Sequence, residues 1–396
     1  PDMIVCISHS GTDKNPKKSE DEILAKKVPE IDLIVSGHSH TKLNEPIRHG
    51  DTYIVSCKSY AIYVGEISLT QKENGRWEVS RYELIPTEGV APNPVVQAKL
   101  QTFKQGIDKV YMGKFGYKSE QVLAKAEKLY THPEMGHIIA DMYRKAVSEY
   151  EIETENAALM GYGQPIDLAV VPTGVAREDW KHLDVTAEDV FNCFSLGIGP
   201  DQIAGYPLVS VYLTGREFKN ACEIDCTMGN TLGVSLLHLF FSGIIYEYNP
   251  HRMILDKVTK VYLIKADGTK EQVEDNKLYR VVSDIYTGKM LKSVNDLTKG
   301  LVSLVPKNSD GSVIENLEDN IIYTKVFPDM NEFKAWAAIA KGVEMTGYVG
   351  DYTPITEAAF TSVPSRNLFK IMAHPSKFGS IVYGVIFGLI AVVVVI

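Results

Sequence analysis

The apolar and polar positions along the first 85 residues predict a small α/β fold. Residues 3–7 form a short apolar run and residues 31–35 a second one, and both are typical of buried, parallel strands. A Ser-x-x-Glu pattern at residues 19–22 predicts a helix that begins there and ends near Pro29. Residues 73–76 predict a hairpin turn. Three antiparallel strands are expected around it, at residues 53–56, 61–70 and 77–85.

A break that carries Pro and Gly at residues 86–94 predicts a domain boundary, and helical periodicity over residues 95–110 predicts a connecting helix. A long helix is expected at residues 136–150. Five strands are expected in the second domain, at residues 168–172, 207–213, 244–248, 258–265 and 278–283. Residues 346–377 carry Gly, Pro, Thr and Ser and predict a stalk.

The composition is that of a globular protein. Of the 396 residues, 45% are hydrophobic and 23% are charged, and 41 Lys and Arg against 50 Asp and Glu give a net charge of −9. The sequence has no long basic stripe, which argues against a nucleic-acid polymer as partner. The five cysteines are odd in number and scattered, so we expect reduced, structural thiols rather than a disulfide framework.

The two ends of the sequence carry their own expectations. The chain opens at Pro1 and enters an apolar strand almost at once, so we expect that residues upstream of it are missing. Residues 378–396 contain no charge, and 19 helical residues extend about 28 Å, close to the hydrocarbon thickness of a bilayer. This segment is predicted to be a single membrane-spanning helix that tethers a globular protein.

Three histidines directly follow the first two strands. His9 lies in a Ser-His-Ser-Gly segment after the first strand, and His38 and His40 lie in a Gly-His-Ser-His segment after the second. The carboxyl ends of neighbouring parallel strands line one crevice, and residues i and i+2 of extended backbone point the same way. Neutral imidazole is a common ligand of zinc, manganese and iron. The pattern therefore predicts that these three histidines bind metal at one edge of the sheet.

These two segments resemble the last two metal-binding motifs of the calcineurin-like metallophosphoesterases. In particular they are similar to the 5′-nucleotidase and UDP-sugar hydrolase group, in which a C-terminal substrate-binding domain follows the metal-binding domain. The resemblance covers most of residues 1–340. It implies two divalent metal ions, zinc, manganese or similar, with His9 and His38 on one ion and His40 on the other. Such a pair generates hydroxide and clamps the phosphate during in-line displacement.

The family's other motifs, Asp-x-His, Gly-Asp and Gly-Asn-His-(Asp/Glu), lie upstream in its members and are absent from this sequence. They supply the bridging carboxylate, further ligands and a catalytic histidine, so the resemblance places no catalytic residue in this chain. We expect an N-terminally truncated enzyme with little or no phosphatase activity as it stands. The expected parts are the remainder of a calcineurin-like αββα domain at 1–88, a linker helix at 89–115, an α+β 5′-nucleotidase C-terminal domain at 116–345, the stalk at 346–377 and the membrane helix at 378–396.

Several segments of the second domain resemble the 5′-nucleotidase C-terminal domain. They are residues 134–141, 170–177, 190–194, 213–218 and 242–246. By this resemblance Gly174 and Arg177 belong to the substrate-binding loop, where a guanidinium can bind a carboxylate, a phosphate or a ribose hydroxyl. Phe194 can stack on a flat base, and Tyr286 is the candidate for a second aromatic residue in the site.

The sequence departs from the family pattern where the nucleotide is bound. Pro172 and Leu196 stand in place of a sugar-binding asparagine and a second pocket asparagine, and the Gly-Gly-Asp-Gly loop is absent. The leading hypothesis is a metal-dependent phosphoester hydrolase that acts on 5′-nucleotides or related phosphorylated small molecules at the cell surface. Two alternatives stay open. One is a degenerate surface binding protein, and the other is a hydrolase of cyclic nucleotides or nucleotide sugars.

Two observations give opposite membrane orientations. Arg366, Lys370 and Lys377 precede the apolar segment, and the positive-inside rule would place the main domains in the cytoplasm. The family resemblance places them outside the cell. We follow the resemblance and expect a cell-membrane protein with one C-terminal helix and extracellular main domains.

Overall fold

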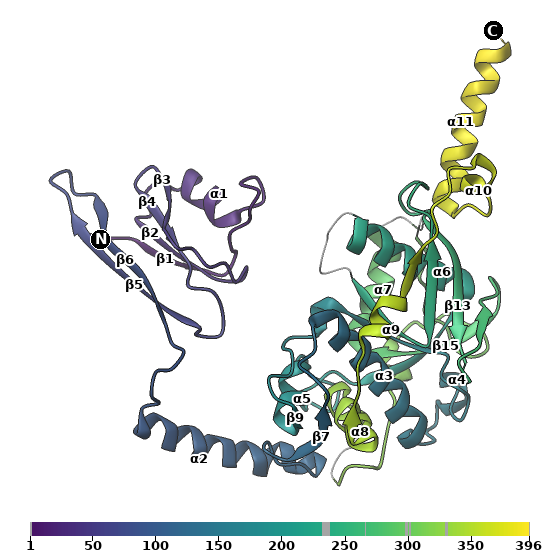
Figure 1. Cartoon of the computed structure of the whole chain (residues 1–396), viewed down its shortest axis with the longest axis horizontal. Coiled ribbons are helices and arrows are strands. Elements are labelled where there is room, and N and C mark those ends of the chain that lie inside the picture. Colours follow the sequence, from purple (N-terminus) through teal and green to yellow (C-terminus); the bar gives the residue numbers. More distant parts are fainter. Residues whose placement is uncertain are drawn as a thin grey trace. The chain divides into compact units, whose positions relative to one another are not determined.

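The computed structural model describes residues 2–231, 238–265, 267–297, 300, 302–328 and 332–395 (Figure 1). The chain forms two compact units, unit 1 (Pro1–Leu100) and unit 2 (Gln101–Ile396). Both units combine helices with sheets, which confirms the predicted α/β class.

Unit 1 is built on a four-stranded sheet that is covered on both faces. The strand order is β1 (Val5–Ser8), β2 (Leu33–Ser36), β4 (Thr52–Val55) and β3 (Ile47–His49). β1, β2 and β4 run parallel, and β3 is antiparallel to β4. The covering elements are α1 (Glu20–Lys27) on one face and the hairpin of β5 (Tyr63–Gln71) and β6 (Trp77–Pro86) on the other. Successive residues of β2 and β4 alternate between these two apolar layers.

The elements predicted for the first 85 residues are present, and their ends lie within two residues of the expected ones. The prediction that residues 53–56 belong to an antiparallel stretch with the hairpin strands is wrong, because β4 pairs in parallel with β2 and only β5 and β6 pair with each other. The predicted capping box at the start of α1 is wrong. The Ser19 side chain makes no capping hydrogen bond, and the Glu22 carboxylate instead lies 2.7 Å from Nε2 of His49 on β3. A contact between α1 and the edge strand β3 has therefore replaced the local one.

The main sheet of unit 2 has strands that are buried on both faces. Its order is β10 (Leu208–Thr214), β15 (Leu278–Asp284), β8 (Leu168–Pro172) and β11 (Leu239–Ser242). β15 and β8 are parallel, whereas β10 and β11 are antiparallel to their neighbours. Every residue of β8 is buried, and successive residues alternate between two hydrophobic cores. The apolar run at residues 168–172 is thus explained by a central position in the sheet.

The first core lies between the main sheet and two helices, α3 (His132–Tyr150) and α8 (Ala335–Thr346). Trp336 of α8 is fully buried, and its ring meets Phe115 edge to face with the centroids 4.6 Å apart. Gly136 lets α3 approach the sheet closely, because a Cβ at this position would overlap the ring of Phe240 on β11. The packing of α3 therefore depends on a residue without a side chain.

The second core lies on the opposite face of the main sheet. It is formed with α6 (Gly215–Glu223), α7 (Ile285–Leu297) and a second sheet. The second sheet has the order β14 (Lys270–Gln272), β13 (Val258–Ile264), β12 (Ile244–Tyr248) and β17 (Phe360–Ser362), and a third has the order β16 (Tyr348–Val349), β7 (Val122–Ala126) and β9 (Asp184–Thr186). The other α-helices are α2 (Pro94–Val110), α4 (Ala157–Met160), α5 (Ala187–Cys193), α9 (Thr353–Ala358), α10 (Leu368–Met372) and α11 (Lys377–Val395). The connecting helix predicted at residues 95–110 is present as α2.

The prediction that residues 346–377 form a stalk is wrong. Within this segment β16 pairs with β7, and β17 pairs with β12. The Tyr352 hydroxyl donates a hydrogen bond of 2.8 Å to Asp141, and the Arg252 guanidinium donates one of 2.8 Å to the carbonyl of Ala373. The composition of this segment alone predicted an extended stalk. In the structure, strands and buried side chains of unit 2 instead form hydrogen bonds with the segment's polar groups.

The predicted membrane segment is helical as far as it is described. α11 covers Lys377–Val395, while Ile396 lies outside the described residues. Among the residues that the structure describes, no helix combines the length and the apolar content that crossing a bilayer requires. The membrane span at residues 378–396 stays a prediction.

Replacing Gly136 by Ala should destabilise unit 2 by about 1–3 kcal/mol, because the added methyl group must displace the Phe240 ring in a packed core. Gly106→Ala makes the same chemical change on α2, where a Cβ would meet no atom within 4 Å, and should be neutral or stabilise by up to about 1 kcal/mol. Urea unfolding of each full-length variant, followed by tryptophan fluorescence, measures the difference. Equal unfolding midpoints for the two variants would contradict this packing.

Candidate functional site

A buried carboxylate joins the ends of β1 and β2. Asp21, in the first turn of α1, is fully buried and accepts hydrogen bonds of 2.5 Å from the hydroxyl groups of Ser8 and Ser36. The amide of Gly11 also donates to it, at 3.1 Å. Hydrogen bonds to a carboxylate are short and roughly twice as strong as those between neutral groups. Asp21 therefore fixes the two loops that carry the predicted metal ligands, although the sequence did not point to it.

The structure brings two of the three predicted histidines together. The rings of His9 and His38 meet edge to face, with their centroids 5.1 Å apart. The ring of His40 lies instead against Tyr60, with a centroid distance of 5.8 Å. All three histidines are exposed. The site therefore presents a histidine pair to solvent, with the third histidine directed to a different neighbour.

The reason for expecting His38 and His40 on one face is wrong. Both residues have left-handed backbone conformations, with φ of 58° and 52°, so this backbone is not extended. A left-handed residue interrupts the two-residue alternation that a strand imposes on its side chains. Such conformations at residues other than glycine cost of the order of 1–3 kcal/mol each and concentrate at functional sites. The loop after β2 therefore remains a candidate functional site because of its left-handed residues, and not because of an extended backbone.

Hydroxyl groups secure the same loop. The Ser39 hydroxyl accepts a hydrogen bond of 3.0 Å from the amide of Thr12, and the hydroxyls of Thr12 and Thr41 lie 3.0 Å apart. Gly11 has φ of +91°, and a Cβ there would lie 2.9 Å from Cβ of Ser39. The close approach of the two loops thus requires glycine at position 11.

His9 and His38 can supply part of the ligand set of a metal centre, but not all of it. Imidazole nitrogens at exposed strand ends are accessible ligands for a divalent transition metal. In the part of the chain that the structure describes, no three His, Cys, Asp or Glu side chains lie together so that they could hold one ion. A catalytic zinc site takes three protein ligands, and a two-metal centre takes more. A complete centre would need ligands in addition to this pair.

The predicted substrate loop and Tyr286 lie at one edge of the main sheet of unit 2. β8 and β15 are parallel neighbours, so their carboxyl ends share this edge. Gly174 lies in the turn directly after β8, and Tyr286 lies in the first turn of α7, directly after β15. Arg177 follows on the same loop as Gly174, and its amide donates a hydrogen bond of 2.9 Å to the carbonyl of Cys193 at the end of α5. The loop is therefore tied to α5.

Two positions of this loop, Gly174 and Arg177, are accessible from the solvent, whereas Val175 and Ala176 between them are buried. Arg177 is exposed, and a Cβ at Gly174 would meet no atom within 4 Å. A guanidinium in this position can reach a planar or tetrahedral anion that approaches the sheet edge. The structure thus places both predicted residues where a substrate could contact them.

Phe194 does not lie at the surface of this edge. Its side chain is fully buried, and its ring meets Tyr143 of α3 edge to face, with the centroids 5.9 Å apart. Stacking on a base would require an open ring face, and the core encloses this one. The structure therefore corrects the expected placement, because Phe194 packs α5 against α3.

Tyr206 takes the surface position beside Tyr286. The two rings are stacked, with centroids 5.6 Å apart and an interplanar angle of 20°, and Tyr286 is 42% exposed. Tyr206 lies just before β10, which is antiparallel to β15, so that Leu208 pairs with Asp284 at the same edge. The sequence offered one signal for Tyr206, namely an aromatic residue one position before a predicted strand. The direction of that strand, which brings Tyr206 to this edge, could not be predicted from the sequence.

A histidine–aspartate pair also reaches this edge. His238 precedes β11, and its carbonyl accepts a hydrogen bond of 2.9 Å from the amide of Thr173. Its Nδ1 lies 3.1 Å from the carboxylate of Asp225, which is 3% exposed. This hydrogen bond raises the pKa of His238 above its ordinary value. No sequence signal pointed to the pair, since neither residue belongs to a motif.

The part of the chain that contains this sheet edge is similar to a known domain family. Residues 117–292 match the family described as the 5′-nucleotidase, C-terminal domain. This part of the chain is similar to the 5′-nucleotidase C-terminal domain. The matched residues include the loop after β8, both tyrosines of the stacked pair and the His238–Asp225 pair.

Two proteins to which the chain is similar come from Bacillus subtilis (strain 168). The trifunctional nucleotide phosphoesterase protein YfkN is 25% identical over 293 residues, which cover 72% of this chain and 18% of YfkN. The uncharacterized metallophosphoesterase YunD is 25% identical over 309 residues, which cover 74% of this chain and 58% of YunD. The chain thus spans less than two thirds of the length of each relative.

A solved structure with the same fold is the 5′-nucleotidase precursor from Thermus thermophilus. It superposes with a TM-score of 0.58 at 18% identity, and the match covers 91% of this chain and 64% of that one. This likeness shows a shared fold.

Replacing Asp21 by Asn should loosen the loops after β1 and β2. Hydrogen bonds to charged groups contribute about 1.5–3 kcal/mol each, so we expect amide hydrogens of residues 8–12 and 36–41 to exchange at least about 10-fold faster. Hydrogen exchange of the full chain, read by mass spectrometry of these peptides, measures the effect. Asp51→Asn is the matched control, because Asp51 is 43% exposed and contacts surface arginines. Unchanged exchange in Asp21→Asn would show that this carboxylate does not hold the loops.

Proposed function

We propose that the protein is a metal-dependent phosphoester hydrolase that acts on nucleotides. The observation that carries this proposal is the match of residues 117–292 to the 5′-nucleotidase C-terminal domain. The similarity to YfkN, whose name describes a nucleotide phosphoesterase, supports nucleotides as the substrate class. The histidine pair of unit 1 supports metal as the source of the hydrolytic chemistry.

In this proposal unit 1 is part of a calcineurin-like metallophosphoesterase domain. His9 and His38 would be metal ligands, and Asp21 would keep their loops in register. Bound divalent ions would supply an activated water and neutralise charge on the phosphate. The edge strand β1 leaves the side chain of Ile7 87% exposed, which favours a further segment of protein against this edge. We infer that such a segment carries the remaining ligands and the catalytic histidine.

Unit 2 would bind the organic part of the substrate. Tyr286 offers an exposed ring on which a base can stack, with Tyr206 behind it as support. Arg177 offers a planar fork of donors to a phosphate or a ribose hydroxyl. Phe194 would act only through the packing of α5, since its ring is enclosed. Recognition would therefore depend on residues that follow the two parallel strands.

We also propose that α11 anchors the protein in a cell membrane, with the main domains outside the cell. Ile381, Val385 and Phe387 on this helix are each about half exposed, and a bilayer would cover such an apolar face. The extracellular placement follows the family resemblance. The intact mass of the native protein bears on the whole proposal. A mass well above the 44.0 kDa of this chain favours a hydrolase with a complete centre, whereas an equal mass favours a binding protein.

The metal assignment is tested in the native full-length protein by phosphate release from nucleoside monophosphates. Chelation should abolish activity, and manganese or zinc should restore it. His38→Ala should lower kcat by about 10³-fold or more and reduce the bound metal measured by mass spectrometry, since a ligand is lost. His182→Ala is the control, because that side chain is 71% exposed in unit 2. Wild-type turnover and metal content in His38→Ala would contradict the assignment of His38 as a metal ligand.

The substrate edge is tested by Tyr286→Ala. Loss of a base-stacking ring should raise KM for a nucleotide about 10-fold and leave kcat nearly unchanged. Tyr286→Phe keeps the ring and should keep KM near the wild-type value. Phe194→Ala should instead lower stability by about 3–5 kcal/mol, as expected for a core aromatic residue. A wild-type KM in Tyr286→Ala would remove this residue from the site.

A further inference from the structure

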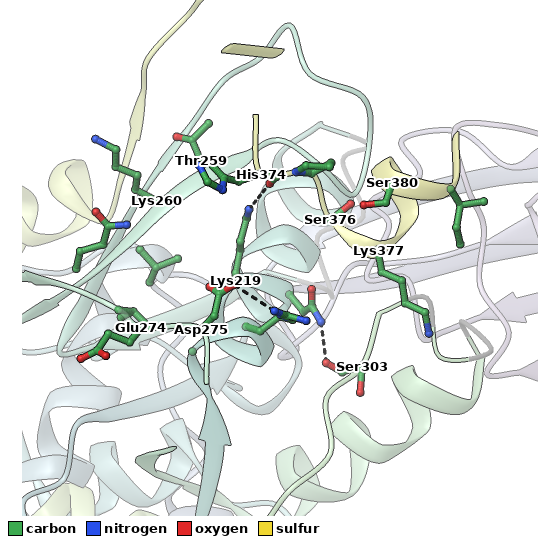
Figure 2. A pocket seen from close by; sticks show the side chains of 18 residues that line it. Lys219, Thr259, Lys260, Glu274, Asp275, Ser303, His374, Ser376, Lys377 and Ser380 are labelled. Carbon is green, nitrogen blue, oxygen red and sulfur yellow. Dashed lines mark hydrogen bonds and ion pairs between the residues drawn. The ribbon is translucent and has the colours of Figure 1, made fainter. Parts of the chain in front are cut away.

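A pocket of about 1210 Å³ lies in unit 2 where the second sheet meets the start of α11 (Figure 2). Its walls come from α6, from β13, from the end of β14 and the turn after it, and from residues 374–381. None of its lining residues belongs to the sheet edge that carries Arg177 and Tyr286. The pocket is thus separate from the substrate site proposed above.

The side chains around the pocket favour an anion. The lining includes four cations and two carboxylates, namely Arg216, Lys219, Lys260 and Lys377 against Glu274 and Asp275. Asp275 already pairs with Arg216, at 3.4 Å. Figure 2 shows Lys219 in the middle of the pocket, with Lys260 to one side and Lys377 to the other. Lys260 also lies 4.0 Å from the Glu247 carboxylate, so the pocket has a small excess of positive charge, whereas the whole chain has a net charge of −9.

Lys219 is the cation that an anion would stabilise most. Its Nζ donates a hydrogen bond of 3.1 Å to the carbonyl of His374, and none of the ion pairs among the described residues includes it. Partial burial lowers the pKa of Lys219, and the more distant carboxylates of Glu223 and Asp256 offset this only in part. A negatively charged group at Nζ would replace the solvation that burial removes.

Apolar residues from more than one wall line the pocket, and one of them belongs to a helix with an exposed apolar face. Val261 and Val273 line the pocket together with Ile381, which lies near the start of α11. Val385 continues the exposed apolar face of that helix. On the neighbouring α10 the side chain of Phe369 is 89% exposed, which is typical of a residue that inserts into a lipid interface. A ligand with an anionic head and an apolar chain matches this arrangement.

We propose that this pocket binds the headgroup of an anionic phospholipid. The phosphate would lie at Nζ of Lys219, because lysine ammonium groups are common phosphate ligands. The hydroxyl groups of Ser376 and Ser380 line the same pocket and can donate to the remaining phosphate oxygens. The volume exceeds the need of a free phosphate ion and leaves room for glycerol and the first carbons of an acyl chain. The assignment is independent of the proposed hydrolase activity.

A bound headgroup would join the body of unit 2 to the root of α11. That root is already held by a buried ion pair between Arg252 and Asp256, at 2.7 Å. Arg252 donates to the carbonyl of Ala373, and the Asp256 carboxylate accepts a hydrogen bond of 2.5 Å from the amide of Ser376. Because the root is fixed in this way, lipid in the pocket would set the orientation of unit 2 at a membrane surface.

The test is a calorimetric titration of the full chain in non-ionic detergent with dihexanoyl phosphatidylglycerol. We expect this lipid to bind at least 10-fold more tightly than dihexanoyl phosphatidylcholine or inorganic phosphate. Lys219→Gln should weaken binding at least 10-fold, while Lys219→Arg should largely retain it. Lys145→Gln removes the same charge from an exposed position on α3 and should have no effect. The lipid should also slow acylation of Lys219 by an amine-reactive reagent in the unchanged protein.

Equal binding of the two lipids would overturn the proposal, because the pocket would then not recognise an anionic head. Binding of inorganic phosphate as tight as that of phosphatidylglycerol would assign a site for free phosphate and overturn the lipid assignment. Unchanged affinity in Lys219→Gln would do the same. Should that variant fail to fold, protection of Lys219 from acylation in the unchanged protein decides the question.

Discussion

Parallel pairing of neighbouring strands is the constraint on which both candidate sites depend. Two strands that run side by side in one direction release their loops about 4.8 Å apart at the same edge. In unit 1, β1 and β2 bring His9 and His38 together in this way. In unit 2, β8 and β15 bring Gly174 and Tyr286 to one edge. Backbone register therefore makes neighbours of residues that are distant in sequence, and the side chains then decide what each edge can bind.

Register alone does not hold a loop, and the two units secure theirs differently. The apolar layers of unit 1 are small, and its strand ends are joined through the carboxylate of Asp21, which bonds to both strands. In unit 2 the central strand β8 lies between two large cores, and apolar burial positions its end. The loops of unit 1 that carry the predicted metal ligands are therefore sensitive to one polar group, whereas the sheet edge of unit 2 that carries Gly174 and Tyr286 depends on the packing of many residues.

The sequence predicted what local periodicity determines. The buried run of β8, the alternation in β5 and β6 and the helical period of α2 each follow from positions a few residues apart. It predicted less where distant contacts decide the outcome. The backbone of His40 is left-handed because of the loop in which it lies, and β17 pairs with β12 although Phe360 and Tyr246 are more than 100 residues apart. Likewise, a phenylalanine at position 194 of the sequence does not indicate whether its ring lies in the core or at the surface.

The same difference between local and distant determinants applies to the residues of the candidate sites. Gly174, Arg177 and Tyr286 were predicted through the resemblance of their segments to the family's substrate-binding loops, and the structure places Gly174 and Tyr286 directly after strands. Asp21 and Tyr206 were not found, since each acts through a partner on another element. The ligation of metal by His9, His38 and His40 stays a prediction, since the described residues hold no group of three ligands.

The departure at Pro172 has a consequence for recognition at the substrate edge. Pro172 is the last residue of β8, is buried, and pairs with Leu239 of β11, so it offers no side chain that could hydrogen-bond a sugar. The amide of the next residue, Thr173, is already bonded to the carbonyl of His238. In the proposed function, recognition would then depend on Arg177 and Tyr286, with the His238–Asp225 pair at the same edge. Arg177 is exposed at this edge, whereas His238 lies 3.1 Å from the Asp225 carboxylate, so a substrate with a negatively charged group would meet its cationic partner in Arg177.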